Sequence, residues 1–361
     1  MTTIGPMRIL IVRLSAVGDT VHGLPVLSAL RDHLPNAYLS WVVEERAAAV
    51  LEGHPALDRL IVAPRRWLRS PMAVWRLTRQ MRAVRPQIAI DLQGLTKSAV
   101  AARLSGAPVR IGATSPDGRE FSTWLNNRLV SQTGTHVVDR YLELLGPLGI
   151  SRPAVRFDVP RQAADEFSMG RFVRERGLGG GFALLNPGAG WVSKRWPIER
   201  FAAVARHLGR NRRLPSVVVW AGAQERAWAD QIITTSSGFA HMAPPTSLGE
   251  LAELARRARL FVGSDTGPLH LAAAVGTPCV GLYGPVSALK NGPYGAAHIA
   301  IQRMLVEGSS RERREASDES MRAIEITDVC NAADRLLGQQ EPQPSIPPWN
   351  SIPWATSASA A

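Results

Sequence analysis

Residues 7–23 of the chain read MRILIVRLSAVGDTVHG. The first eight are nearly all apolar, which predicts a short strand that is buried on both faces. A turn of Ser, Ala, Val, Gly and Asp follows at 15–19, and a helical pattern then continues to about Leu34, where Pro35 and Asn36 end it. A buried strand that leads through a polar turn into a helix opens a parallel βαβ unit. This stretch therefore predicts an α/β protein.

The same alternation runs through most of the chain. Further strands are expected at 39–43, 60–62, 88–92, 109–111, 182–186, 216–221, 260–263 and 279–283. Helices are expected at 46–51, 72–84, 97–104, 136–148, 161–176, 198–208, 225–234, 248–258, 268–275 and 328–337. The glycine run at 177–181 precedes a strand, so it is interpreted as a linker and not as a dinucleotide-binding loop. Strands that alternate with helices favour a doubly wound parallel sheet in each half.

A chain of 361 residues exceeds the length of roughly 250 residues at which single hydrophobic cores stop growing. We expect an N-terminal domain at 1–165, a C-terminal domain at 166–338, and a disordered Pro/Ser/Ala-rich tail at 339–361. The segment 308–321 is expected to be a charged loop. A content of 45% hydrophobic and 20% charged residues excludes collagen-like, coiled-coil and wholly disordered proteins.

Two features suggest the compartment. No apolar run approaches the roughly 18 residues that a membrane-spanning helix needs. Cys279 and Cys330 are the only cysteines, so a disulfide framework is not expected. Both observations favour the cytoplasm.

The net charge of +12 predicts an anionic partner, which could be nucleic acid, a membrane surface or a phosphorylated substrate. The charge is concentrated at 59–85, which holds eight arginines and no acidic residue. If 72–85 is a helix, its arginines form a broad cationic face beside Trp75 and Met81. The alternative is an ordinary solvated helix in an arginine-rich protein.

Four motifs follow predicted strands, where ligands of open α/β sheets bind. The first contains Asp19, which is either an N-cap of the following helix or a general base at a glycine-loosened turn. The second is NPGAGWVSKRWP at 186–197. There Gly188 would let the backbone approach a phosphate, and Lys194 would supply a charge. Because the chain has only three lysines, an incidental surface cation is the weaker interpretation of Lys194.

The third and fourth motifs lie in the second half. Glu225 follows the strand at 216–221 and could accept hydrogen bonds from ribose hydroxyls, although a favourable charge in the first helical turn explains it equally well. The fourth motif, VGSDTGPLHLAAA at 262–274, combines a strand, a polar turn and a helix that starts with proline. Its turn amides and Thr266 could hold a phosphate, and Asp265 could bind sugar hydroxyls. His270 is either a ligand contact or a core histidine.

With these motifs in place, the chain resembles a known family. The stretches RLSAVGDTVHGLPVL at 13–27, DLQGLTKSA at 91–99, KRWP at 194–197, SDTGPLHLAAA at 264–274 and GLYGP at 281–285 are similar to the lipopolysaccharide heptosyltransferases of glycosyltransferase family 9. The resemblance covers about residues 7–338. Within the family, 91–98 and Gly118-Arg119-Glu120 resemble the heptosyltransferase I group.

The resemblance implies a GT-B architecture, in which two Rossmann-like domains face a cleft, the first binding the acceptor and the second the donor. It implies transfer of heptose from ADP-heptose to the Kdo region of lipid A core with inversion, without a cofactor or metal. Asp19 would be the base and Lys194 would neutralise the leaving diphosphate. The other residues implied for the donor are Gly188, Glu225, Asp265, Thr266, Gly267 and His270.

The implied acceptor is an acidic glycolipid on a membrane surface, and contact with the inner face of the inner membrane would follow. Basic residues of the first domain would bind this acceptor. They are Lys97, Arg119, Arg140, Arg65, Arg66 and Arg69.

Other functions remain as alternatives. A related transferase could use another nucleotide sugar, or it could act on a later acceptor in the manner of heptosyltransferase II. A non-catalytic anion-binding or nucleic-acid-binding protein would explain the charge but not the carboxylates at the strand ends. A nicotinamide dehydrogenase is disfavoured because no glycine fingerprint follows a strand, and no metal-ligand motif occurs.

Overall fold

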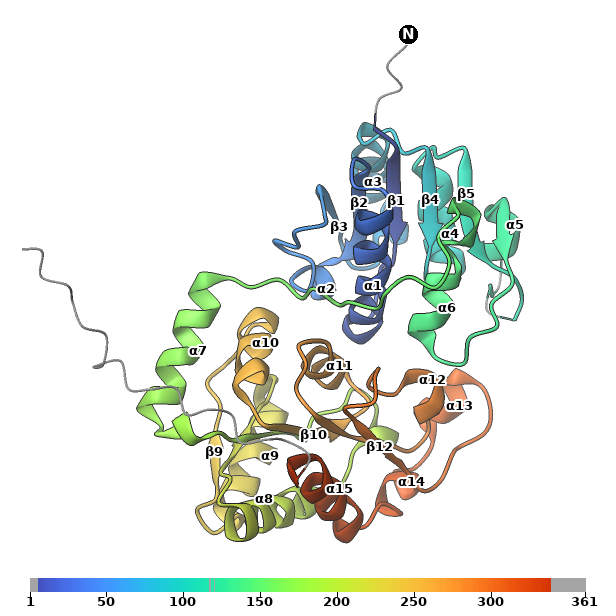
Figure 1. Ribbon diagram of the computed structural model, residues 1–361. Helices are drawn as coiled ribbons and strands as arrows, with labels where there is room; N and C mark the ends of the chain where they lie inside the picture. The colour runs from blue at the N-terminus through green and yellow to red at the C-terminus, as the bar shows by residue number, and fades with distance from the viewer. Residues whose placement is uncertain (1–5, 117, 120, 339–361) are drawn as a thin grey trace, which may run out of the picture.

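The computed structural model describes residues 6–116, 118–119 and 121–338. The predicted tail at 339–361 and Glu120 of the Gly118-Arg119-Glu120 motif lie outside the described residues. The chain forms two α/β units that meet end to end (Figure 1).

Each unit contains a six-stranded parallel sheet. The first sheet is built from β1 (Arg8–Val12), β2 (Tyr38–Glu44), β3 (Arg59–Ala63), β4 (Ile88–Asp91), β5 (Val109–Ala113) and β6 (Arg128–Val130). The second is built from β7 (Ala183–Asn186), β8 (Ser216–Val218), β9 (Ala240–Met242), β10 (Leu260–Ser264), β11 (Cys279–Tyr283) and β12 (Ile299–Gln302). The spatial orders are β3-β2-β1-β4-β5-β6 and β12-β11-β10-β7-β8-β9. Both are the Rossmann order, 3-2-1-4-5-6, so the predicted doubly wound α/β class is confirmed.

Helices cover both sheets. Those of the first unit are α1 (Val17–His33), α2 (Glu45–Ala48), α3 (Pro71–Ala83), α4 (Thr96–Leu104), α5 (Ser122–Leu125) and α6 (Val137–Glu143). Those of the second are α7 (Ala163–Glu175), α8 (Ile198–Arg212), α9 (Gly222–Thr235), α10 (Leu248–Arg257), α11 (Gly267–Ala274), α12 (Ala288–Asn291), α13 (Ser310–Glu315), α14 (Glu319–Arg322) and α15 (Ile326–Gly338). None of the helices within the described ranges is long and apolar enough to cross a membrane.

The central strands β1, β4, β7 and β10 match the predicted apolar runs, because they are buried on both faces. Three strands were not predicted: β6, β9 and β12. All three are edge strands of three or four residues that are only partly buried. A short, half-exposed edge strand leaves little apolar pattern in the sequence.

Two predictions about the remaining segments were wrong. The segment 308–321 contains α13 and most of α14 and is not simply a loop. Ser309 begins α13 because its hydroxyl accepts the Glu312 amide while the Glu312 carboxylate accepts the Ser309 amide. The helix predicted at 136–148 ends at Glu143, and a separate 3-10 turn follows at Gly146–Leu148.

The connection between the units runs through residues 150–162, which form neither helix nor strand. It crosses the front of Figure 1 as a green trace and leads into α7. Helix α7 packs on α10 of the second unit, where the Ser168 hydroxyl donates to Glu250 at 2.9 Å. The domain division at residue 165 stays a prediction.

The two units touch where α1 meets α11 (Figure 1). Two glycines permit this approach. A Cβ atom on Gly18 would lie 2.8 Å from Cδ2 of His270, and one on Gly267 would lie 2.8 Å from Cγ1 of Val17. Behind this contact the buried apolar cluster is continuous from Val21 and other α1 side chains to α11. The junction therefore requires the smallest residue on each side.

The variant Gly18→Ala tests this packing. The His270 ring is held by two hydrogen bonds and cannot simply turn away from an added methyl group. We expect the free energy of unfolding to fall by about 1–3 kcal/mol, measured by urea denaturation. Gly179→Ala is the matched control, because nothing lies within 4 Å of a Cβ atom there. Equal stability of the two variants would contradict a tight junction.

Candidate active site at the domain junction

In both sheets the strand order reverses between the first and fourth strands, β1 and β4 in one unit and β7 and β10 in the other. Loops that leave neighbouring strands in opposite directions open a crevice at such a point, and ligands bind there. Asp19 lies in the first turn of the helix after β1, Gly188 lies in the loop after β7, and Asp265 follows β10. Lys97 belongs to α4, which follows β4. Three of the four motifs, together with the stretch 91–99 that contains Lys97, therefore lie at the two switch points.

Asp19 lies in the first turn of α1, directly after Gly18, which faces His270 of the second unit. Its Oδ2 atom accepts the Ala16 amide at 3.0 Å and forms an ion pair with Arg13 at 2.5 Å. The second oxygen, Oδ1, has no partner in the described part of the chain, and the side chain is 39% exposed. The interpretation of Asp19 as the N-cap was therefore wrong, because Ala16 is the N-cap and Asp19 closes the start of the helix from the third helical position. Its second oxygen remains free to bind a ligand.

Arg13 was not identified from the sequence. It is buried, and besides Asp19 it contacts the Leu92 carbonyl at 3.3 Å and the Tyr141 ring. Burial alone would lower the pKa of Arg13, but the Asp19 carboxylate outweighs that effect and raises it. Arg13 is therefore a fixed positive charge that orients Asp19. The available signal in the sequence was an arginine placed directly after an apolar strand.

The predicted acceptor residues occupy several elements of the first unit. The Lys97 ammonium donates to Ser15 Oγ at 2.9 Å and to Glu44 Oε1 at 3.1 Å, which brings it beside the loop of Asp19. Arg119 is exposed and its amide donates to the Gly94 carbonyl after β4. Arg140 lies on α6. The remaining three, Arg65, Arg66 and Arg69, are exposed after the carboxyl end of β3.

The arginine-rich stretch does not form the single face that was predicted. Met81 is fully buried and points into the core, not to the surface. Arg85 lies beyond the end of α3, and Arg82 Nε donates to the Leu104 carbonyl. The stretch divides between the two ends of the sheet, because α3 returns the chain from the carboxyl end of β3 to the start of β4.

On the second unit, Lys194 and Asp265 form a nearly buried ion pair. The ammonium lies 2.5 Å from Asp265 Oδ2, and the two side chains are 15% and 10% exposed. The ammonium also lies 4.5 Å from the centre of the Trp191 ring. Lys194 was expected to face a diphosphate. In this structure its charge is directed at the Asp265 carboxylate, and the diphosphate contact stays a prediction.

A histidine pair links this ion pair to the first unit. His270 Nε2 lies 2.9 Å from Asp265 Oδ1, and His270 Nδ1 lies 3.1 Å from His22 Nε2 on α1. A carboxylate only accepts hydrogen bonds, so His270 donates through Nε2; in its neutral form this leaves His270 Nδ1 to accept from His22 Nε2. His270 is therefore buried, as one interpretation held, but bonded to the site at both ring nitrogens.

His22 is a functional candidate that the sequence analysis missed. It lies one helical turn after Asp19, so the spacing of three residues was the available signal. Burial, followed by the nearby His270, His136 and Arg13, lowers the pKa of His22 well below its ordinary value. Burial would raise the pKa of Asp265, but the His270 hydrogen bond and the Lys194 charge lower it. At the junction the His22 imidazole is thus neutral. It bonds to His270, which in turn bonds to the ionised Asp265 carboxylate.

The start of α11 completes the centre of the site. Thr266 precedes the helix and Gly267 is its first residue. Asn186, at the end of β7, donates to Thr266 Oγ1 at 3.1 Å. The first amides of a helix have no partner within the helix, so this end can bind an anion. This helix end lies close to Lys194, because Asp265, which pairs with Lys194, is the residue just before Thr266.

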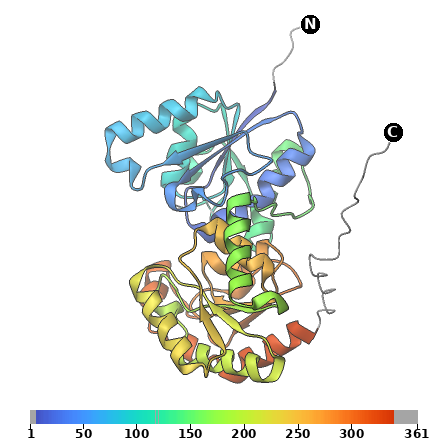
Figure 2. The same cartoon turned by 90° about the vertical axis from the view of Figure 1, so that its left-hand side faces the viewer.

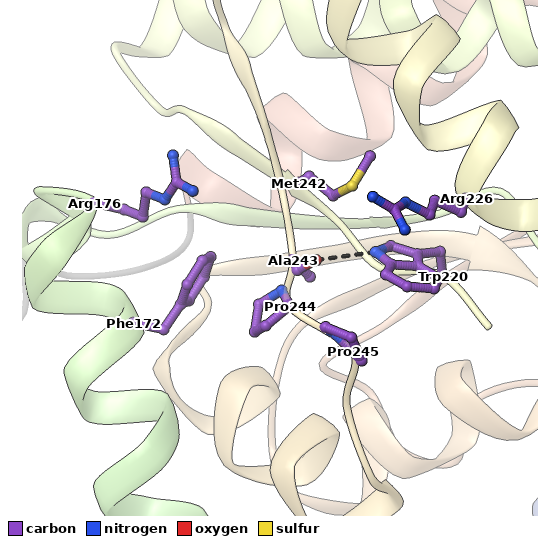
Figure 3. Close-up of a pocket in the computed structure, with 8 residues that line it drawn as sticks. All are labelled: Phe172, Arg176, Trp220, Arg226, Met242, Ala243, Pro244 and Pro245. Carbon is purple, nitrogen blue, oxygen red and sulfur yellow. Dashed lines mark hydrogen bonds between the residues drawn. The ribbon is translucent and has the colours of Figure 1, made fainter. Parts of the chain in front are cut away.

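A pocket of about 320 Å³ lies at the carboxyl ends of β8 and β9 (Figure 3). Its walls are mainly apolar, and the Trp220 indole donates to the Ala243 carbonyl at 2.9 Å. The residues that line it are Phe172, Arg176, Trp220, Arg226, Met242, Ala243, Pro244 and Pro245. A flat aromatic ring is the kind of group that such walls accommodate.

Glu225 belongs to the same region, in the first turn of α9. Its Oε2 atom accepts the Ala221 amide at 2.8 Å. A Cβ atom on Gly188 would lie 2.4 Å from the Glu225 carboxyl carbon, so a side chain at this position would displace the carboxylate. Within the described residues, no group of three or more His, Cys, Asp and Glu side chains could hold a metal ion.

The pH dependence of stability tests the neutral state of His22. Because folding lowers its pKa, the unfolded chain takes up a proton near pH 6.5 that the folded chain does not. The contribution of neutral His22 to the free energy of unfolding is therefore complete above about pH 6.5. It declines as the pH falls below this value, by up to about 1.4 kcal/mol per pH unit. In urea denaturation between about pH 7.5 and 5.5, His22→Gln should show a shallower decline than the parent protein.

His33→Gln is the control, since His33 is an exposed histidine at the end of the same helix. Parallel stability curves for the parent and His22→Gln would show that His22 is not held neutral.

Comparison with known proteins supports the predicted family. The family model described as glycosyltransferase family 9 (heptosyltransferase) matches residues 74–320. Lipopolysaccharide heptosyltransferase 1 of Pseudomonas aeruginosa is 31% identical over 82% of this chain and 83% of its own length. Lipopolysaccharide heptosyltransferase 3 of Escherichia coli is 25% identical over 89% of this chain and 96% of its own.

Solved structures give the same fold. A family 9 glycosyltransferase from Veillonella parvula superposes with a TM-score of 0.82 at 24% identity, covering 94% of this chain and 99% of its own. An Escherichia coli heptosyltransferase solved with ADP gives 0.71 at 24% identity, covering 91% and 97%. The two facing Rossmann-like units are therefore a GT-B fold. With this fold, and with a family match over more than half its length, the chain belongs to glycosyltransferase family 9, the heptosyltransferases.

Proposed function

We propose that this enzyme transfers heptose from ADP-heptose to the Kdo region of lipid A core during lipopolysaccharide synthesis. The observation that carries the proposal is the junction itself. A carboxylate with a free oxygen, Asp19, lies at the end of one sheet, and the ion pair of Lys194 and Asp265 lies at the facing end of the other. Four heptosyltransferase 1 relatives are 29–31% identical over about 300 residues and a fifth is 24% identical, against 25% and 26% for two heptosyltransferase 3 relatives, and the higher values favour the first heptose addition.

The donor would lie on the second unit. Its adenine would enter the pocket beside Trp220, and the Glu225 carboxylate would accept hydrogen bonds from the ribose hydroxyls. The diphosphate would bind at the start of α11, against the amides of Thr266 and Gly267. An Escherichia coli relative solved with ADP-2-deoxy-2-fluoro heptose supports a donor of this class.

Lys194 would then exchange partners. Its ammonium now pairs with Asp265, and the arriving diphosphate would attract it more strongly because it carries more charge. Release from Lys194 would free Asp265 Oδ2 to accept hydrogen bonds from heptose hydroxyls, while Oδ1 stays bonded to His270. The donor would thus find its cationic contact already in place.

Transfer would occur across the junction. Asp19 Oδ1 would accept the proton of the acceptor hydroxyl as that oxygen forms a bond to the anomeric carbon. The bond from this carbon to the diphosphate breaks on the opposite face, so the configuration inverts. The electrons leave with ADP, where Lys194 and the α11 amides stabilise the growing negative charge.

The acceptor would lie on the first unit. Its carboxylates would bind basic residues at the carboxyl edge of the first sheet, of which Lys97 lies beside the Asp19 loop. A lipid-anchored acceptor also calls for contact with an anionic membrane surface. Cys279 and Cys330 are both buried and unpaired, which supports action in the reducing cytoplasm.

The variant Asp19→Asn tests the base. It keeps the shape of the side chain but cannot accept the acceptor proton. We expect kcat for transfer to a Kdo-bearing lipid A acceptor to fall by about a hundredfold to ten-thousandfold. Binding of ADP-heptose, measured by calorimetry, should be unchanged, since the donor lies on the other unit. Retained turnover would exclude Asp19 as the base.

Binding of a panel of nucleotide sugars tests the donor. ADP-heptose should bind more tightly than UDP- and GDP-sugars, and Lys194→Ala should weaken it by about tenfold to a hundredfold. Lys290→Ala removes the same charge at an exposed position of the same unit and should have no effect. Tighter binding of another nucleotide sugar would overturn the donor, and equal binding by both lysine variants would overturn the role of Lys194.

A further inference from the structure

A second hollow lies at the other end of the first sheet. Its volume is about 570 Å³, and its walls include the first residues of β1, β2 and β3, namely Arg8, Tyr38 and Arg59. The rest of the lining comes from α3 and the residue that follows it: Trp75, Arg76, Arg79, Gln80, Ala83 and Val84. The proposed transfer site lies at the carboxyl ends of the strands. This pocket lies at their amino ends, so it is separate from the donor and acceptor positions.

The pocket is strongly cationic. Four arginines line it, Arg8, Arg59, Arg76 and Arg79, and no acidic side chain does. Residues 59–90 contain no Asp or Glu at all. Among the described residues, none of these four arginines forms an ion pair with a carboxylate. Four uncompensated guanidinium groups around one hollow favour an anion with several oxygens, such as a phosphate.

The outer face of α3 presents exposed apolar side chains beside these arginines. Met72, Trp75, Arg76 and Arg79 follow helical spacing on one side, while Leu77 and Met81 on the other side are buried. Met72 is 54% exposed and Trp75 is 56% exposed, and the Arg79 guanidinium lies 5.5 Å from the Trp75 ring. Figure 2 shows α3 in light blue on the flank of the first unit, away from the second. Arginines beside exposed aromatic and aliphatic groups are typical of helices that lie in a membrane interface.

We propose that α3 and this arginine pocket form a docking surface for an anionic phospholipid membrane. A lipid phosphate enters the pocket and binds the arginines, while Met72 and Trp75 enter the interfacial layer. The two kinds of contact select this partner. A soluble phosphate would account for the pocket but not for the exposed Met72 and Trp75, and nucleic acid would not require Met72.

This inference deepens the proposed function, since it supplies a membrane contact for an enzyme with a lipid-anchored acceptor. Helix α3 begins after the loop of Arg65, Arg66 and Arg69, at the carboxyl edge of the sheet, and ends at the amino edge. A membrane lying along α3 therefore reaches from the pocket to the edge that holds Asp19. The docked enzyme would keep its transfer site beside the bilayer surface.

Sedimentation with lipid vesicles tests the surface without donor or acceptor, so a failure here leaves the transfer proposal untouched. The full chain should bind vesicles that contain phosphatidylglycerol and phosphatidylethanolamine, and bind phosphatidylcholine vesicles weakly. The double variant Arg76→Gln/Arg79→Gln should bind the anionic vesicles about thirtyfold less tightly. Trp75→Ala should weaken binding without a change in charge. Raised salt should weaken the parent protein more than the double variant.

The matched control is Arg210→Gln/Arg314→Gln, which removes the same charge from exposed positions on the second unit. It should bind like the parent protein. Equal binding by the two double variants would overturn the docking surface, because only total charge would then matter. The proposal would also be overturned if the pocket bound inorganic pyrophosphate or a DNA duplex, sensitive to Arg76→Gln/Arg79→Gln, while anionic vesicles did not bind.

Discussion

The close contact between the start of α1 and the start of α11 is the constraint on which the site depends. In a doubly wound sheet, every loop that can bind a ligand leaves from the same edge. Two such sheets can act on one reaction only if those edges face each other at short range. Gly18 and Gly267 allow this, because a methyl group at either position would collide with the opposite unit. The hydrogen bond between His22 and His270 then fixes the register of the two helices.

Each carboxylate that we assign to the chemistry has a cationic partner in the unliganded protein. Arg13 holds Asp19, and Lys194 holds Asp265. The two pairs differ in burial, and the difference matches their proposed roles. Arg13 is buried beneath Asp19 and stays fixed, whereas Lys194 sits beside the helix start where a diphosphate could replace its partner. An ion pair that is nearly buried is costly to break without a substitute charge, so Lys194 should move only when the donor arrives.

The sequence was most informative where the chain is most buried. The apolar segments that form β1, β4, β7 and β10 were recognisable in the sequence, because strands that are covered on both faces are continuously apolar. The polar motifs that follow β1, β7, β8 and β10 were recognisable because ligands of parallel sheets bind at the carboxyl ends of the strands. The edge strands β6, β9 and β12 were missed because they are short and half exposed. Local sequence also could not show that α3 carries its arginines from one end of the sheet to the other, since this depends on where the helix packs.

His22 shows a further limit of local sequence. Its role depends on His270, which lies 248 residues away, and a contact at that separation leaves no local pattern. Arg13 and Asp19 are only six residues apart, but the pairing requires the turn between them to bring both side chains to one side. Residue types and spacing could identify the polar groups of the site, but not which of them would be bonded to each other.

The single connection at residues 150–162 has a consequence for how the protein is made. Every strand of the first sheet comes from residues before this segment, and every strand of the second from residues after it. The first unit can therefore fold on the ribosome before the second has been synthesised. During that interval the face of α1 that carries Gly18, Val21 and His22 has no partner. It remains exposed until α11 emerges, and during this time the nascent chain is most open to wrong association.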